Sequence, residues 1–174
     1  MRPLSVLPVK LVMIYLYRER RKYRQALDLL QDEWGMIDHQ SQEFFFDQTD
    51  YYVKEMGQPL FRSITSFINL VDPSELASIK LRTNQIEIIL TKEGSRTVNL
   101  DPGYLDYDKL VLASAKYNYQ KIYLGKGIYA DPILFYRKGR FEDLEWTFPD
   151  FKEGMYESDL LHIRYLYKQQ SKGR

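Results

Sequence analysis

The chain has 174 residues, with 25 basic and 24 acidic side chains, a formal net charge of +1 and no cysteine. This length supports one compact domain with a real core and is slightly short for two, so we predict a single domain over residues 1–174. The balanced charge argues against recruitment by nucleic acid or an anionic membrane, and the missing cysteines exclude disulfides, thiolate metal sites and a cysteine nucleophile.

The N-terminal run from Met1 to Tyr17 is apolar, but Pro3, Pro8 and Lys10 interrupt it. It falls short of the roughly 18 uninterrupted apolar residues of a spanning helix, and no small-residue cleavage site follows. We therefore expect a lead-in to a central strand over residues 10–17, buried on both faces, in a cytoplasmic protein without membrane contact.

Two amphipathic helices are predicted in the first half of the chain. The first covers residues 18–34, where apolar side chains recur at helical spacing, and Gly35 is placed to end it in a left-handed conformation. The second begins at Asp72-Pro73-Ser74-Glu75, which has the pattern of a capped start, and runs to Gly94. Further strands are expected over residues 44–46 and 60–70.

The stretch 96–105 contains the pair Pro102-Gly103, which fits a tight turn because proline presets one φ angle and glycine accepts the positive φ required next. We therefore expect a strand that ends at Asp101, with Tyr104 leaving the same corner. Residues 106–116 fit either a buried strand or a short helix, and we favour the strand.

The rest of the chain predicts three strands from residue 121, joined by hairpins at 125–127 and 138–139, in an antiparallel meander. Pro132 cannot donate to a ladder, so its strand should be an edge there or contain a bulge. A last helix is expected over residues 156–170, with its apolar side chains on one face.

The order of these elements predicts an α+β fold. Strand, helix, strand, followed by the same three again, indicates a ferredoxin-like βαβ-βαβ core over residues 9–116. Right-handed crossovers would place both helices on one face of the sheet. The β-meander and the C-terminal helix, over residues 120–170, would be appended to this core.

Several enzyme classes lack their motifs. Gly125-Lys126-Gly127 lies between two predicted strands and has no following Ser or Thr, unlike a phosphate-binding P-loop. A Rossmann fingerprint, a Gly-x-Ser-x-Gly nucleophile elbow and the histidine pair of a zinc protease are absent. What remains is a set of carboxylates beside phenols, in connections between strands and helices where sites often lie.

These residues predict a cleft that binds a small polar or phosphorylated ligand. Its expected lining is Asp47, Asp50, Tyr51, Asp101 and Tyr104, with Lys116 as counter-charge. Alternatively, Asp50 and Asp101 hold Mg²⁺, the one cofactor that these residues suggest, in a hydrolase or transferase. In another alternative, each acid bonds its own main chain. A third possibility is an interaction module without a pocket, docking a protein through the tyrosine-rich meander edge.

Five segments together resemble a known family: FDQTDYYVKEMG at 46–57, NLDPGYL at 99–105, KLVLASAK at 109–116, IYLGKGIYAD at 122–131 and RKGRFEDLEWTFPDF at 137–151. They are similar to a family of small prokaryotic proteins known as domain of unknown function 4416, which carries a Leu-Asp-Pro-Gly-Tyr-Leu signature. The resemblance implies a single-domain cytosolic protein of similar length. It brings no established activity.

Overall fold

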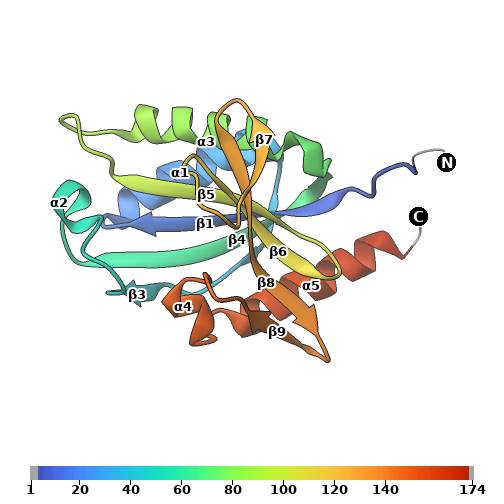
Figure 1. Cartoon of the computed structure of the whole chain (residues 1–174). Helices are drawn as coiled ribbons and strands as arrows, with labels where there is room; N and C mark the ends of the chain where they lie inside the picture. Colours follow the sequence, from blue (N-terminus) through green and yellow to red (C-terminus); the bar gives the residue numbers. More distant parts are fainter. Residues whose placement is uncertain (1–3, 173–174) are drawn as a thin grey trace.

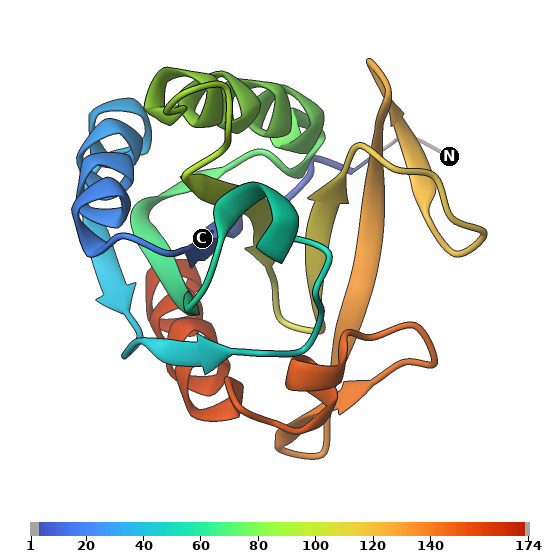
Figure 2. The same ribbon diagram turned by 90° about the vertical axis from the view of Figure 1, so that its left-hand side faces the viewer.

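The structure is a computed structural model that describes residues 4–172. Within this range one antiparallel sheet of nine strands lies between helices on both faces (Figures 1 and 2). The elements are β1 (Val9–Tyr17), α1 (Arg20–Trp34), β2 (Ile37–Gln40), β3 (Phe44–Phe46), α2 (Val53–Met56), β4 (Leu60–Val71), the 3₁₀ turn η1 (Pro73–Glu75), α3 (Leu76–Leu90), β5 (Val98–Leu105), β6 (Lys109–Ser114), β7 (Ile122–Gly125), β8 (Ile128–Arg137), β9 (Arg140–Asp143), α4 (Pro149–Lys152) and α5 (Glu157–Ser171). The first three residues of the predicted N-terminal lead-in lie outside the described range.

Strand β1 is the centre of the sheet, between β4 and β5, and all nine of its residues are buried. Side chains alternate along a strand, so Leu11 and Met13 face α1 and α3, whereas Val12 and Ile14 face α5. This confirms the predicted central strand. Its continuous apolar sequence follows from having a helical layer on each side.

Helices α1 and α3 cover the same face of the sheet, as expected (Figure 2). Two helix ends differ from the prediction. Gly35 has φ 89° and ψ −171°, so it ends α1 outside the left-handed helical region. Helix α3 stops at Leu90, and Gly94 belongs to the following turn. The inner face of α3 consists of five buried residues at helical spacing: Leu76, Ile79, Thr83, Ile86 and Leu90.

The strand order is β2-β4-β1-β5-β6-β8-β7, with β3 on β4 and β9 on β8, and every pairing is antiparallel. The ferredoxin-like core stays a prediction: α1 follows β1 and precedes β2, α3 joins β4 to β5, and the order β2-β4-β1-β5 places another strand between the two strands of each unit. The mixed α and β content and the large antiparallel sheet agree with an α+β fold. The meander continues the same sheet through the β6–β8 pairing.

The predicted turn at Pro102-Gly103 is wrong, because β5 runs straight through it and pairs both residues with β1. Leu100 donates its N–H to the Glu87 carboxylate and accepts Lys80 at its carbonyl, so both groups face away from β1. Pro102 lies two residues further along β5, where a backbone N–H would also face away from β1. The proline therefore removes no hydrogen bond between β5 and β1.

Glycine is required at position 103 for its lack of a side chain. A Cβ there would lie 2.6 Å from Leu112 Cδ2 and 3.2 Å from Leu112 Cα, and it would also collide with the Val111 carbonyl. The close approach of β6 therefore explains Gly103 without a turn.

The second half of the chain follows the prediction more closely. Residues 109–114 form a strand, the meander has its three strands, and the register of β8 against β6 shifts at Ile133, beside Pro132. The short helices α2 and α4 were not predicted. Along α5 and its cap, the expected face is buried: Tyr156, Leu160, Ile163 and Tyr167. Among the helices of residues 4–172, none has the length and apolar character that a membrane crossing requires.

Candidate functional site

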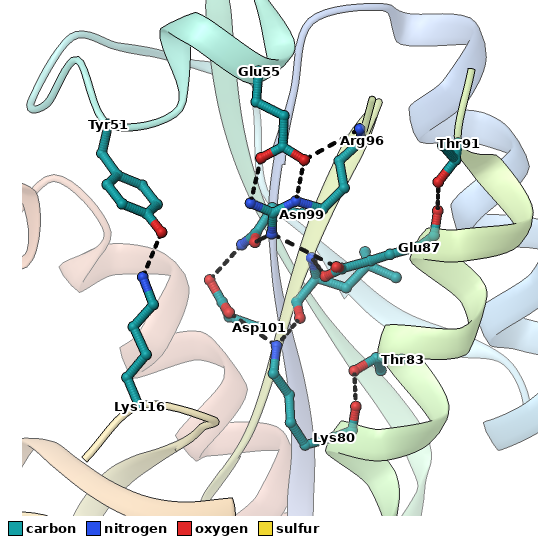
Figure 3. Close-up of polar contacts among 11 residues, drawn as sticks. Tyr51, Glu55, Lys80, Thr83, Glu87, Thr91, Arg96, Asn99, Asp101 and Lys116 are labelled. Carbon is teal, nitrogen blue, oxygen red and sulfur yellow. Dashed lines mark hydrogen bonds and ion pairs between the residues drawn. The ribbon is translucent and has the colours of Figure 1, made fainter. Parts of the chain in front are cut away.

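Two of the predicted site residues meet across the fold. Lys116 donates from Nζ to the Tyr51 hydroxyl at 2.6 Å, and the same nitrogen lies 4.1 Å from the centre of the Tyr51 ring (Figure 3). The two residues are 65 positions apart. The hydrogen bond and the charge of Lys116 lower the pKa of the Tyr51 phenol. Both side chains are exposed, so this contact is accessible from solvent.

Asp101 is held by side chains from two elements. Its Oδ2 accepts from Asn99 Nδ2 at 2.7 Å, and its Oδ1 lies 3.2 Å from Lys80 Nζ, which also donates to the Leu100 carbonyl at 2.7 Å. The alternative that Asp101 bonds the backbone of its own turn is wrong, because no turn exists here. The buried Lys80 of α3 holds the Asp101 carboxylate instead.

Glu87 extends this cluster inside the molecule. The side chain is buried, and its Oε1 accepts the Leu100 N–H at 2.6 Å. Burial raises the pKa of Glu87, while the Lys80 charge, the Leu100 amide and Arg96 partly oppose this rise. The Glu87 carboxylate therefore accepts a backbone N–H at the edge of β5, in the part of the strand that does not pair with β6.

Arg96 connects the cluster to the loop that carries Tyr51. It holds Glu55 by two parallel bonds, Nε to Oε1 at 2.8 Å and Nη2 to Oε2 at 2.6 Å, and donates to Asn99 Oδ1 at 2.8 Å. This guanidinium lowers the pKa of Glu55. The pair of Arg96 and Glu55 fixes the segment that carries Tyr51 above β5 (Figure 3). In the same segment, burial and the nearby charge of Asp101 raise the pKa of Tyr52 to about 12.

The other three predicted residues do not join this cluster. Asp47 and Asp50 are exposed in the loop before α2; Asp47 accepts from the Gln48 side chain at 3.2 Å, and the Asp50 carbonyl accepts from the Val53 amide. Tyr104 packs among the apolar residues under α3. It is three residues from Asp101 on one strand, so the two side chains leave opposite faces of the sheet.

The structure adds five residues that the prediction of the site did not include: Glu55, Lys80, Glu87, Arg96 and Asn99. Glu87 was detectable, because it lies four residues after Thr83 and three before Leu90, on the buried face of α3. The pairing of Glu55 with Arg96, 41 positions apart, has no local signal in the sequence.

Within residues 4–172 no group of three or more His, Asp or Glu side chains lies close enough to hold an ion. Both oxygens of Asp101 already have protein partners. Two hollows, of about 330 and 470 Å³, lie elsewhere, and neither is lined by a predicted site residue.

Comparison with known proteins gives one result. The family model described as Domain of unknown function (DUF4416) matches residues 7–167. Neither a curated protein nor a solved structure gives a significant match. Because the family match covers nearly all of the described residues, the resemblance inferred from the five sequence segments is confirmed. The chain belongs to the DUF4416 family, a domain of unknown function.

Proposed function

We propose that the protein binds a small polar ligand with an anionic group, such as a phosphate, between the Tyr51 loop and Lys116. The observation that carries this proposal is the exposed contact between the Tyr51 hydroxyl and the Lys116 ammonium at 2.6 Å. Two connections that are distant in the sequence meet there, and Figure 3 draws this contact to one side of the charged cluster around Asp101. A phenol and a lysine at such a junction are suited to receive a ligand.

Lys116 is available for an anion. Within the described residues its ammonium has one hydrogen-bond partner, the neutral Tyr51 phenol. An exposed contact of this kind contributes little to stability, whereas a phosphate oxygen accepts a stronger, charge-assisted hydrogen bond. A ligand phosphate can therefore replace the phenol on Lys116 and leave the Tyr51 ring beside the ligand.

Asp101 supplies the opposite chemistry. Its side chain is 32% exposed, and Lys80 and Asn99 hold its carboxylate in one orientation. A fixed carboxylate that solvent still reaches can accept hydrogen bonds from ligand hydroxyl or amino groups. Phosphate at Lys116 and hydroxyls toward Asp101 together favour a sugar phosphate or a nucleotide.

Thermal-shift measurements with sugar phosphates and nucleoside monophosphates test this function. At least one compound should raise the melting temperature of the wild-type protein. The variant Lys116→Gln should lose that shift, while its melting temperature without ligand should differ little from that of the wild type. Lys168→Gln, an exposed lysine on α5, is the matched control and should keep the shift. The proposal fails if no compound stabilises the protein or if Lys116→Gln responds like the control.

A second candidate function is docking of a partner protein at the meander edge. Strand β7 ends the sheet, and its Ile122 and Tyr123 side chains are 61% and 60% exposed although they point to opposite faces. Apolar edge strands are sites of strand addition. A partner at this edge should protect β7 amides from hydrogen exchange, and Tyr123→Lys should abolish both binding and protection while the fold is unchanged.

A further inference from the structure

Three tyrosine rings adjoin one another on one face of the sheet, at its β7 end, and together form what we call the tyrosine surface. Strand pairing places Tyr123 directly opposite Tyr129, so both side chains leave the same face. Tyr117, in the connection between β6 and β7, adds the third ring. The Tyr129 ring centre lies 5.8 Å from that of Tyr117 and 5.2 Å from that of Tyr123. Tyr117 and Tyr123 are 72% and 60% exposed, so solvent reaches this surface.

The tyrosine surface lies on the side of the sheet away from α3. Ile128 and Ala130, the neighbours of Tyr129 along β8, pack with Leu76 on α3, so the Tyr129 side chain points to the other face. Helix α5 packs on that other face, but the β7–β8 hairpin projects away from α5 (Figures 1 and 2). The tyrosines therefore stay exposed where the rest of this face is covered.

The segment that carries the tyrosine surface is basic, although the whole chain is nearly neutral. Residues 114–130 contain Lys116, Lys121 and Lys126 and no acidic residue. Asp131, the acid that follows, is buried, and its Oδ2 lies 3.3 Å from Lys121 Nζ, so this pair contributes no net charge. Lys116 and Lys126 are exposed. The local charge is therefore complementary to an anionic chain, which local contacts rather than a long-range field would hold.

Lys116 and Lys126 lie at the two ends of the tyrosine surface. Lys116 directly precedes Tyr117 in the sequence. Lys126 lies at the tip of the β7–β8 hairpin beside Gly127, whose N–H donates to the Tyr123 hydroxyl at 3.4 Å. An extended chain with regularly repeated negative charges can contact both lysines and the rings between them.

Single-stranded nucleic acid has the chemistry that this arrangement recognises. Every base has an aromatic face that stacks on an exposed tyrosine, and every phosphate accepts hydrogen bonds from lysine. A protein segment added to the edge of the sheet would pair with the backbone of β7. It would leave Tyr117 and Tyr129 unused, because Tyr129 lies on β8, one strand inside the edge. The tyrosine surface therefore favours a nucleic acid over a peptide strand.

We propose that the tyrosine surface, together with Lys116, binds single-stranded RNA. This inference rests on the function proposed above, in which Lys116 receives a phosphate, and it names the ligand as a nucleotide chain. Bases lie on the three tyrosine rings in turn, and Lys126 contacts a further phosphate. RNA is favoured over DNA because the same site offers the Asp101 carboxylate to ligand hydroxyl groups, and the 2′-hydroxyl distinguishes the two nucleic acids.

Chain length separates this inference from the proposed function. A fluorescein-labelled oligouridylate of about ten nucleotides should bind in fluorescence anisotropy, and added salt should weaken the binding. Uridine monophosphate reaches only the Lys116 site and should bind at least about 25-fold more weakly, because each of two further stacked bases accounts for about fivefold or more. If the monophosphate binds as tightly as the oligonucleotide, the inference fails and the proposed function survives. If Lys116→Gln binds both as the wild type does, the phosphate site fails and the inference fails with it.

The sugar is tested with an oligodeoxyuridylate of the same length. It should bind more weakly than the oligouridylate, because it lacks the 2′-hydroxyl. Equal affinity for the two would overturn the assignment to RNA.

Substitutions of the rings separate stacking from general attraction to lysine. The double variant Tyr117→Ala, Tyr123→Ala should bind the oligouridylate about 25-fold or more weakly, since each stacked ring accounts for about fivefold or more. Tyr117→Phe, Tyr123→Phe keeps both rings and should keep the affinity. The matched control Phe45→Ala, Tyr165→Ala removes two exposed rings from β3 and α5 and should bind like the wild type.

These measurements also define the results that overturn the inference. It fails if the oligouridylate does not bind at up to about 1 mM, a very weak affinity. It fails equally if the alanine variant and its matched control lose affinity alike, because the tyrosine surface would then have no particular role.

Discussion

Lys80 and Glu87 differ from the other charged residues of the cluster in being almost fully buried. A buried charge that loses its partner retains its desolvation cost, so removal of one member costs more than the pair contributes as a whole. Lys80 connects the Leu100 carbonyl with Asp101, and Glu87 accepts the Leu100 amide. At the residue scale, the polar cluster stabilises β5 and also shapes the candidate site.

The first prediction compares two lysines. Lys80→Met removes the donor of the Leu100 carbonyl and one of the two donors of the Asp101 carboxylate, and should lower the free energy of unfolding by roughly 3 kcal/mol. Lys116→Met removes an exposed contact and should change it by less than about 0.5 kcal/mol. Urea denaturation measures both values. Similar losses for the two variants would contradict the distinction between a structural and an accessible lysine.

The second prediction concerns pH. Burial raises the pKa of Glu87 above its ordinary 4.5, so the folded protein holds this proton more tightly than the unfolded chain. The resulting stabilisation is complete below pH 4.5 and is lost as the pH rises through the raised pKa. Glu87→Gln removes this loss, and the variant should gain stability relative to the wild type between about pH 4 and pH 7. Urea denaturation across that range checks the sign; a constant difference would refute it.

At the scale of elements, β5 shows how a turn motif can belong to a strand. Pro102 lies where β5 has no neighbour on that side, and Gly103 lies where β6 comes close. Local rules identified both residues as unusual but could not show which strand lies beside them. The three long helices and most strands were predictable because their apolar spacing is local; the short helices α2 and α4 were not, because four residues show no such spacing.

The third prediction tests the role of Gly103. Gly103→Ala forces β6 away from β5 and should destabilise the protein by about 3 kcal/mol, as overpacking of a rigid region does. Gly94→Ala meets no atom within 4 Å but keeps a φ of 79°, so it should cost only about 1 kcal/mol. Thermal and urea denaturation would compare the two. An equal cost would mean that crowding at Gly103 is relieved without strain.

At the scale of the whole molecule, one sheet connects the predicted core over residues 9–116 with the β-meander that the sequence analysis treated as an addition to it. Val12 of β1 and Leu134 of β8 belong to one apolar cluster with Leu160 and Ile163 of α5. A core that spans both parts should unfold cooperatively. The single domain over residues 1–174 stays a prediction, and this cluster is its physical basis.

The fourth prediction uses the two tryptophans, which lie in different parts of the chain. Trp34 ends α1, and Trp146 donates to the Pro132 carbonyl at 2.7 Å beside the meander. In Trp34→Phe the remaining fluorescence reports on the meander, and in Trp146→Phe on the first part. In each variant, fluorescence and far-ultraviolet circular dichroism should give the same urea midpoint. Separate midpoints would show that the parts unfold independently.

The sequence predicted the site less well than the fold. Tyr51 and Lys116 were named and do meet, whereas Asp50 and Asp101 were expected to face each other and have no direct contact in the structure. Arg96 reaches Glu55 only because α2, which carries Glu55, lies over β5. Such a contact depends on long-range topology, which neither periodicity nor motif spacing encodes.

The contact between the two ends of the described chain has a consequence for synthesis. Tyr167 donates to the Pro8 carbonyl, and Gln170 accepts from the buried Lys10 at 2.8 Å, 160 positions away. Helix α5 is synthesised after every other described element, so one face of β1 is uncovered while those elements are made. The nascent chain therefore exposes Val12 and Ile14 until α5 has left the ribosome, and those residues are where a chaperone would bind it.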